Sequence, residues 1–336
     1  MSLAQRSARS AGCPDKVARV TPKSAATKTP IPLVCVVVVL LLVGPLAGCG
    51  SQVGRGRSAT RQLSQLGDSP SWSPDGRRIV FISGPCDSTV CPEQSDLYVV
   101  NSNGTGRHRL TRTRKDWDFG APVWSPDGRR IAFDAEPSSG VAIYVMNADG
   151  SRLRRLTPIA DRDYEPSWSP DGKQIAFKYG RLQDGRIGVM NADGSNRHLL
   201  TPTSVDALAP SWSPDGRRLA FVASAGCCFE IDVMNSDGGN RHRLKADVDT
   251  NNEPVAWSPD GQRLAFDNDF DLWVMNADGR GAHALGVKDG QAPAWSPDGK
   301  RIAFVTFRDH PGIDELYVMD ADGSNQRPLV TTRAGR

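Results

Sequence analysis

Trp124-Ser125-Pro126-Asp127-Gly128, and the apolar segments that follow it, decide the fold of this chain. The pentapeptide Trp-Ser-Pro-Asp-Gly occurs six times, with intervals of 52, 44, 44, 45 and 38 residues between its tryptophans, which are Trp72, Trp124, Trp168, Trp212, Trp257 and Trp295. A period near 44 residues is typical of repeat architectures. All methionines after Met1 stand at one place in the repeat, in Val-Met-Asn or Val-Met-Asp. The sequence is therefore one structural unit copied six times.

Each repeat predicts four short strands, and the copy that begins at Trp124 shows them clearly. The first strand ends at Trp124, the second covers 131–133, the third covers 143–146 and the fourth covers 154–157. Ser-Pro-Asp-Gly has the residue order of a type I turn that closes a hairpin, and Asn-Ala-Asp-Gly at 147–150 follows the same logic. The repeat is therefore a pair of tight hairpins.

The second and third strands are almost continuously apolar, which indicates that both faces of each sheet are covered. Four-stranded sheets that pack face to face around an axis meet this requirement. We expect an all-β fold, a six-bladed β-propeller of four-stranded antiparallel blades, over residues 67–332. A solenoid is the alternative, although the tight turns and the tryptophan in every unit favour the propeller.

The repeat resembles a known family. Residues 122–128, 131–133 and 144–150 resemble the TolB-type, WD40-like propeller repeat called PD40. The resemblance implies a propeller and an extracytoplasmic setting, but no single activity. TolB carries an α/β domain before its propeller, and we expect this chain to lack that domain. The partners of TolB are therefore not carried over.

Two segments compete to close the ring. Residues 60–64 resemble a fourth strand, and so do residues 327–330. We favour the C-terminal segment because it follows the sixth repeat directly, and closure by the N-terminal segment stays open.

The N-terminal region predicts export and a lipid anchor. Basic residues precede an apolar core at 33–43, and this core is followed by Leu46-Ala47-Gly48-Cys49, which resembles a bacterial lipobox. We therefore expect a lipoprotein signal peptide at 1–48, a lipidated Cys49 with a linker to residue 66, and a C-terminal tail at 333–336. The predicted location is the periplasmic side of the cell envelope, anchored to a membrane. An uncleaved signal anchor and a downstream translation start are the alternatives.

Charge argues against nucleic-acid binding. Without residues 1–48 the chain has 35 basic and 37 acidic residues, a formal net charge of −2. Nothing in this balance suggests a nucleic-acid partner. The arginines of Gly-Arg-Arg and Asn-Arg-His recur with the repeat, and we expect them on a solvated face. We expect a monomer.

The remaining cysteines predict little chemistry. Cys86 and Cys91 lie in one loop and form a plausible disulfide in an oxidising compartment, whereas a metal site there is less favoured. Cys227 and Cys228 are adjacent, and burial is favoured over a strained bridge between them.

Strand alternation places every repeated turn on one face of the propeller and every variable loop on the other. Function on a propeller belongs to variable loops on a rigid scaffold. The loops that lead into the first strands are rich in acidic residues, which could form an acidic channel mouth for a cation or a basic partner, or could cap their own loops. The candidate binding face comprises Asp116, Trp117, Asp118, Asp163, Tyr164, Glu165, Asp206, Asp249, Glu253, Asp289 and His310.

No catalytic motif is found in the sequence. Gly-x-Ser-x-Gly does not occur, and four of the histidines share one fourth-strand position, which indicates a structural role; these are His108, His198, His242 and His283. Only His310 stands in a variable loop, where solvation is favoured over catalysis. We expect no catalytic residues, no metal site and no cofactor, with Ca²⁺ as the only candidate.

Two functions compete at this point. The first is a lipid-anchored, non-enzymatic module that binds or scaffolds an envelope protein. The second is a carbohydrate-active or hydrolytic propeller enzyme that uses paired carboxylates of the acidic face. A copurifying protein would favour the first, whereas turnover of a glycan or peptide would favour the second.

Lipidation can be tested directly. Cys49→Ser should leave an uncleaved and unlipidated precursor, because only the thiol can be acylated. Metabolic labelling with a fatty-acid probe measures this, and equal labelling of the variant and the parent would contradict the lipoprotein assignment.

Overall fold

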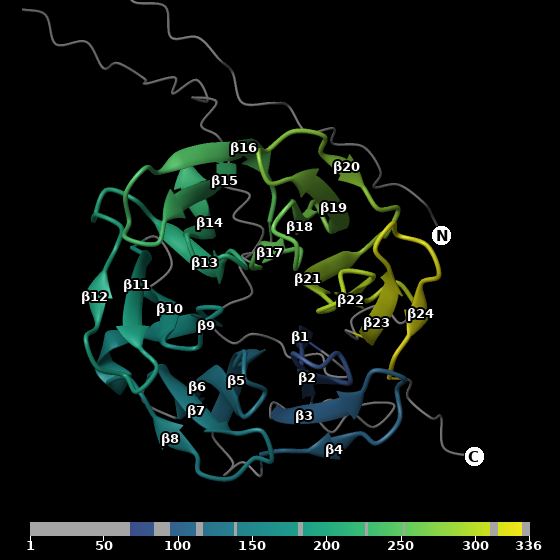
Figure 1. Cartoon of the computed structure of the whole chain (residues 1–336), viewed down its shortest axis with the longest axis horizontal. Helices are drawn as coiled ribbons and strands as arrows, with labels where there is room; N and C mark the ends of the chain where they lie inside the picture. Colours follow the sequence, from purple (N-terminus) through teal and green to yellow (C-terminus); the bar gives the residue numbers. More distant parts are fainter. Residues whose placement is uncertain are drawn as a thin grey trace, which may run out of the picture. The chain divides into compact units, whose positions relative to one another are not determined.

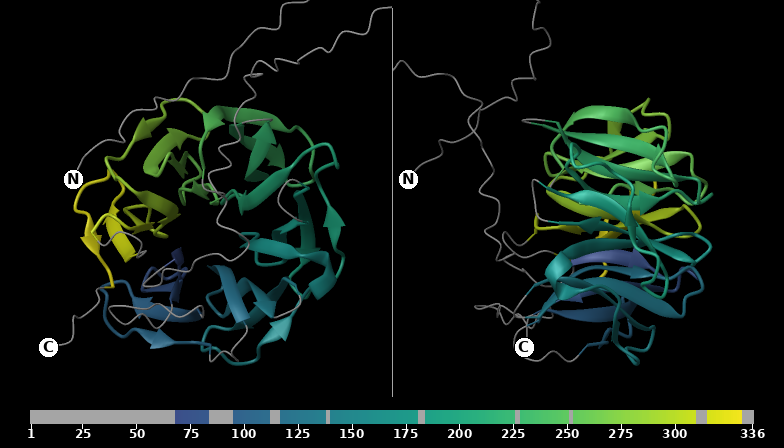
Figure 2. Two further views of the ribbon diagram at one scale, coloured as in Figure 1. Left: turned by 180° about the vertical axis from the view of Figure 1, so that it is seen from behind. Right: turned by 90° about the vertical axis from the view of Figure 1, so that its left-hand side faces the viewer.

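The computed structural model describes residues 68–83, 95–111, 117–137, 140–180, 184–225, 228–250, 253–309 and 315–330. They form six four-stranded antiparallel sheets, and each sheet takes its strands in consecutive order along the chain. The sheets surround a central axis (Figure 1), and Figure 2 shows the same ring from behind and from the side. The predicted six-bladed propeller is confirmed.

Each blade runs from an innermost first strand to an outermost fourth strand. Blades 1 to 3 comprise β1 (Asp68–Trp72), β2 (Arg78–Ser83), β3 (Asp96–Asn101), β4 (His108–Arg109); β5 (Trp117–Trp124), β6 (Arg130–Pro137), β7 (Ala142–Asn147), β8 (Arg154–Arg155); and β9 (Asp163–Trp168), β10 (Gln174–Tyr179), β11 (Arg186–Asn191), β12 (His198–Leu199). Blades 4 to 6 comprise β13 (Ala207–Trp212), β14 (Arg218–Ala225), β15 (Cys228–Asn235), β16 (His242–Val248); β17 (Ala256–Trp257), β18 (Arg263–Asn268), β19 (Asp271–Asn276), β20 (His283–Ala284); and β21 (Gly290–Trp295), β22 (Arg301–Thr306), β23 (Glu315–Asp320), β24 (Arg327–Pro328). A short 3₁₀ helix, η1 (Ile159–Asp161), precedes β9.

In blades 1 to 3 a threonine follows the two-residue fourth strand, and its side chain takes over a hydrogen bond of the third strand. In blade 2 the strand β8 ends at Arg155, before the predicted end at Thr157. The Thr157 hydroxyl accepts the hydrogen bond of the Ile143 backbone N–H at 3.0 Å, so a side chain takes the place of a ladder carbonyl. The same exchange occurs at Thr111 and Thr201.

Ring closure follows the favoured expectation. The strand β24 pairs with β23 and completes blade 6, whereas the competing segment 60–64 lies outside the described residues. Blades 6 and 1 meet in an apolar cluster that includes Trp72, Phe81, Ala303 and Val318. The core of the protein therefore lies between neighbouring blades.

The Ser-Pro-Asp-Gly hairpin forms as the sequence predicts, with an added side-chain lock. In blade 2 the Gly128 N–H donates to the Ser125 carbonyl at 2.9 Å, and Gly128 has a φ of 68°. The Ser125 hydroxyl donates to the Asp127 carboxylate at 2.5 Å and accepts from the Arg130 N–H at 2.9 Å. The Ser–Asp hydrogen bond recurs in all six blades, and in each it helps lower the pKa of the turn aspartate.

The arginine that begins each second strand links neighbouring blades. Arg130 of blade 2 lies over the ring of Trp168 in blade 3, with 4.7 Å from its guanidinium carbon to the ring centroid. Five of the six blade junctions have such a pair, at 4.6–4.8 Å: Arg78–Trp124, Arg130–Trp168, Arg218–Trp257, Arg263–Trp295 and Arg301–Trp72. The expectation that the Gly-Arg-Arg arginines are simply solvated is therefore wrong for the second arginine, which is half-buried, and right for the first.

The junction between blades 3 and 4 lacks this pair, because residue 174, which begins β10 as the arginines begin their strands, is glutamine. Gln174→Arg should complete the set and raise the free energy of unfolding by about 0.5–1 kcal/mol, the usual value of a cation–π contact at a partly exposed site. Chemical denaturation measures the change. Arg218→Gln is the matched control and should lose a similar amount, whereas a destabilised Gln174→Arg chain would contradict the argument.

Candidate functional site

The two faces of the propeller differ in how their polar groups are used. The repeated-turn face carries the first-to-second and third-to-fourth strand turns, and the variable-loop face carries the other connections. On the repeated-turn face the turns of adjacent blades pack together: a Cβ atom at Gly128 would lie 3.7 Å from the Pro74 side chain of blade 1. The candidate site therefore has to be sought on the variable-loop face.

In blade 2 the candidate aromatic is part of the packing. Trp117 on β5 is half-buried, and its ring lies 5.2 Å from that of Tyr144 and 6.0 Å from that of Phe119. Its neighbour Asp118 accepts a hydrogen bond from the Ser95 hydroxyl at 3.3 Å. Asp118 thus contacts blade 1, whereas Trp117 packs inside blade 2 and has only part of its ring exposed to solvent.

In blade 3 two acidic residues, one just before β9 and one at its start, form ion pairs with the same arginine. Asp163 is fully buried, and its Oδ1 lies 2.7 Å from Arg197, which also contacts Asp161 at 2.5 Å. The guanidinium lies over the rings of Phe177 and Tyr179 at 5.2 and 5.1 Å. Burial raises the pKa of Asp163 to about 6, although the Arg197 charge opposes the shift. This arrangement is an ion pair inside the blade and exposes no carboxylate of Asp163.

Glu165 takes part in hydrogen bonds that cross from blade to blade at the inner end of β9. Its backbone has a φ of 54°, and its N–H donates to the Asp134 carboxylate of blade 2 at 3.0 Å. Its own carboxylate accepts from the Ala209 N–H of blade 4 at 2.7 Å. The side chain of Glu165 therefore satisfies a backbone group at a bulge in β13.

Tyr164 and Asp206 also have partners close by. The Lys178 ammonium lies 5.0 Å from the Tyr164 ring centroid, and Lys178 is only 4% exposed. The Asp206 carboxylate accepts the Gly185 N–H at 2.9 Å. The candidate carboxylates and the tyrosine of blades 3 and 4 therefore already contact other groups of the protein.

Blades 5 and 6 are different, because their candidate aspartates gather around two aromatic rings. Asp249 and Asp289 lie beside the hairpin 268–271, which carries two further aspartates, Asp269 and Asp271. No hydrogen bond or ion pair of these four carboxylates is found among the described residues. Burial and the charge of Asp269 raise the pKa of both Asp249 and Asp271. Phe270 at the hairpin tip is 40% exposed and meets Phe307 edge to face at 5.9 Å.

Sequence analysis identified only Asp249 and Asp289 of this group. Asp269, Phe270, Asp271 and Phe307 were missed because the tip of the hairpin has no glycine to mark it. Both Asp269 and Phe270 adopt the left-handed conformation, with φ of 54° and 61°. A two-residue turn with both φ values positive normally selects Asn-Gly or a similar pair.

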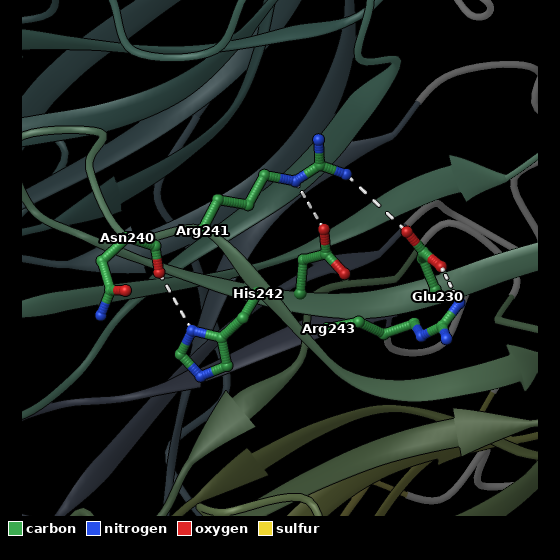
Figure 3. A network of polar contacts seen from close by, with 6 residues as sticks. Glu230, Asn240, Arg241, His242 and Arg243 are labelled. Atoms are coloured by element: carbon green, nitrogen blue, oxygen red, sulfur yellow. Dashed lines mark hydrogen bonds and ion pairs between the residues drawn. The ribbon is translucent and has the colours of Figure 1, made fainter.

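Blade 4 has a charged network on its outer rim that sequence analysis also missed. Arg241 contacts Asp232 at 2.6 Å and Glu230 at 3.7 Å, and Arg243 contacts Glu230 at 3.2 Å (Figure 3). Asp232 is 2% exposed and stands where four other blades have an aromatic residue. Burial raises its pKa, and its Oδ1 has no hydrogen-bond partner in the part of the chain that the structure describes. The network links β15 to the start of β16.

The repeated histidines lie as expected on the outer strands. Each is exposed, and its Nδ1 lies within 2.9–3.1 Å of the carbonyl two residues earlier; they are His108, His198, His242 and His283. Glu253 is half-buried beside β17. Cys49, Cys86, Cys91, Asp116 and His310 lie outside the described residues, so their predicted roles stay predictions.

Two features are absent from the described ranges. No group of three or more histidine, cysteine or acidic side chains there is arranged to hold a metal ion. No helix within the same ranges is long and apolar enough to cross a membrane.

Comparisons with known proteins agree with this architecture. Residues 54–204 match the family described as PD40, TolB beta propeller domain. The Tol-Pal system protein TolB of Anaeromyxobacter dehalogenans strain 2CP-C is 36% identical over 98 residues, which cover 29% of this chain and 20% of the relative. The uncharacterized peptidase YuxL of Bacillus subtilis strain 168 is 29% identical over 91 residues, which cover 27% of this chain and 14% of that protein.

Among solved structures, TolB of Acinetobacter baumannii has a TM-score of 0.59 and 24% identity, over 69% of this chain and 57% of that one. This likeness shows the fold. The chain spans about a fifth of the length of the first curated relatives it matches. Together with the six concordant repeats, these findings show a β-propeller whose repeats resemble the TolB-type PD40 family.

The buried Asp163 predicts a pH dependence of stability. A folded-state pKa of about 6, above the ordinary aspartate value of 3.8, means that the folded chain binds more protons than the unfolded chain between these values. Stability should therefore fall as pH rises from about 4 to about 6, by at most about 3 kcal/mol. Asp163→Asn should lack this loss. Denaturation at pH 4 and pH 7 measures it, and parallel pH profiles of the two chains would contradict the argument.

Proposed function

We propose that this protein is a lipid-anchored, non-enzymatic binding module outside the cytoplasmic membrane, and that its variable-loop face holds a protein of the cell envelope. The lipobox-like Leu46-Ala47-Gly48-Cys49 supports export and anchoring. The relatives named Tol-Pal system protein TolB support an envelope setting and a protein partner. Because the matched region is a small part of those relatives, their partners are a guide to the kind of partner and not to its identity.

The single observation that carries this proposal is the contrast between the two faces. The repeated-turn face uses its serines, aspartates and glycines in hydrogen bonds and packing that recur from blade to blade. The variable-loop face presents the exposed Phe270 and the four aspartates of blades 5 and 6, whose carboxylates form no hydrogen bond or ion pair with any residue that the structure describes. Charged groups without an ion-pair partner and an exposed aromatic ring are features of interaction surfaces.

Site-specific photocrosslinking tests which face binds. A crosslinking amino acid at Asp184 or Lys288, both exposed on the variable-loop face, should capture a discrete partner in cells that make the protein. The matched controls are Arg217 and Gln262, which are exposed on the repeated-turn face. Capture from the control positions alone, or from neither face, would contradict the proposal.

A further inference from the structure

Four loops meet near the junction of blades 5 and 6, and we call six of their residues the Phe270 patch: Asp249, Asp269, Phe270, Asp271, Asp289 and Phe307. The Asp269 N–H donates to the Asp249 carbonyl at 3.0 Å, and the Asp249 N–H donates to the Asn268 side chain at 2.9 Å. On the other side, the Gly290 N–H donates to the Phe270 carbonyl at 2.6 Å. The hairpin tip is therefore tied by backbone hydrogen bonds to both neighbouring loops.

The Phe270 ring is an exposed apolar surface in an unusual backbone setting. A bulky residue with a positive φ is an outlier, and Phe270 has a φ of 61°. The edge-to-face contact with Phe307, at an interplanar angle of 80°, supports the ring from one side. The ring is nevertheless 40% exposed. Among the described residues, only two other large apolar side chains are exposed, Leu153 and Leu199. The hairpin thus presents an aromatic ring to solvent instead of turning it inward.

The charge near this ring is mainly negative. Four carboxylates lie on the hairpin of Phe270 and on the two loops hydrogen-bonded to it, and the charge of Lys288 favours ionisation of Asp271. Burial raises the pKa of Asp249 and of Asp271, and repulsion by the charge of Asp269 raises both further. A cationic partner would relieve this repulsion, because opposite charge favours the ionised carboxylate.

A single metal ion fits this surface poorly. The four carboxylates come from three loops, and among the described residues no three acidic side chains converge as an ion would require. Charges that are spread around an aromatic ring suit a partner with several cations along an extended chain. Arginine suits the ring best, because its planar guanidinium stacks on aromatic faces and is weakly hydrated. The same protein stacks arginine on tryptophan at five blade junctions, at 4.6–4.8 Å.

From this geometry we propose that the Phe270 patch docks an arginine-rich segment of a protein partner, with one guanidinium over Phe270 and others beside the aspartates. This proposal rests on the proposed function, because it names the chemistry of the partner that the variable-loop face would hold. It differs from the acidic channel mouth expected from the sequence, because the carboxylate of Glu165 is already hydrogen-bonded to Ala209.

A labelled hexa-arginine peptide is the probe, and fluorescence anisotropy across a salt series is the measurement. The parent chain should bind this peptide more tightly than hexa-lysine, and hexa-glutamate should not bind. Phe270→Asn keeps a residue type that tolerates the left-handed conformation but removes the ring, and it should weaken hexa-arginine binding about five- to tenfold. Asp269→Asn combined with Asp271→Asn should weaken binding further and flatten its salt dependence, because two charges are lost.

Asp184→Asn removes an exposed carboxylate on the same face but outside the patch, and it should bind like the parent. Thermal melts of every variant confirm that the fold is retained. Equal binding by the parent and the patch variants, or no binding by the parent, would overturn the proposal. Stabilisation by Ca²⁺ that the double variant lacks would also overturn it, because the occupant would then be a metal ion. Photocrosslinking at Asp184 can still identify a partner in each case, so failure here leaves the proposed function standing.

Discussion

The burial of one tryptophan per blade at the junction with the preceding blade is the interaction on which the ring depends, and at five of the six junctions an arginine of that preceding blade lies over it. The tryptophan ends the innermost strand, where neighbouring sheets come closest, and it is nearly buried in every blade. In two junctions its indole N–H also reaches the carbonyl of the preceding blade, from Trp72 to Ala294 and from Trp257 to Ser211. One residue thus sets the distance between sheets, and its recurrence makes six sheets into a closed ring.

Much of the fold could be predicted from the sequence, because the same local turn and strand patterns specify each blade. Ser125 and Asp127 fix a turn within five residues, and the apolar segments on either side fix two strands. The length of the fourth strand was not available, because the hydroxyl of Thr157 competes with a backbone carbonyl only after the sheet has formed. The role of Arg130 was hidden for a similar reason, since its partner Trp168 belongs to the next blade.

The candidate site was predictable as a face but not as a set of residues. Acidic residues before the first strands suggested one acidic surface, yet their environments differ. Asp163 and Glu165 form contacts inside and between blades, whereas the carboxylates of Asp249 and Asp289 have no hydrogen-bond partner among the described residues. Charge composition cannot separate these cases, because the difference lies in which backbone N–H or guanidinium the folded ring brings near each carboxylate. Phe270 was overlooked for the same reason, since its exposure depends on three loops that are distant in sequence.

The consecutive order of strands within every sheet has a further consequence for how such a protein can change over time. Blade 6 takes β24 from its own repeat, and its junction with blade 1 uses the same kind of pair, Arg301 on Trp72, as the junctions inside the chain. Every repeat except the third, which has Gln174, therefore carries both halves of a junction, the arginine for one neighbour and the tryptophan for the other. Duplication or loss of one repeat in the gene would preserve every type of contact and change only the curvature that the ring must adopt. The loops of the variable face can meanwhile diverge one blade at a time, because no strand is shared between the described blades.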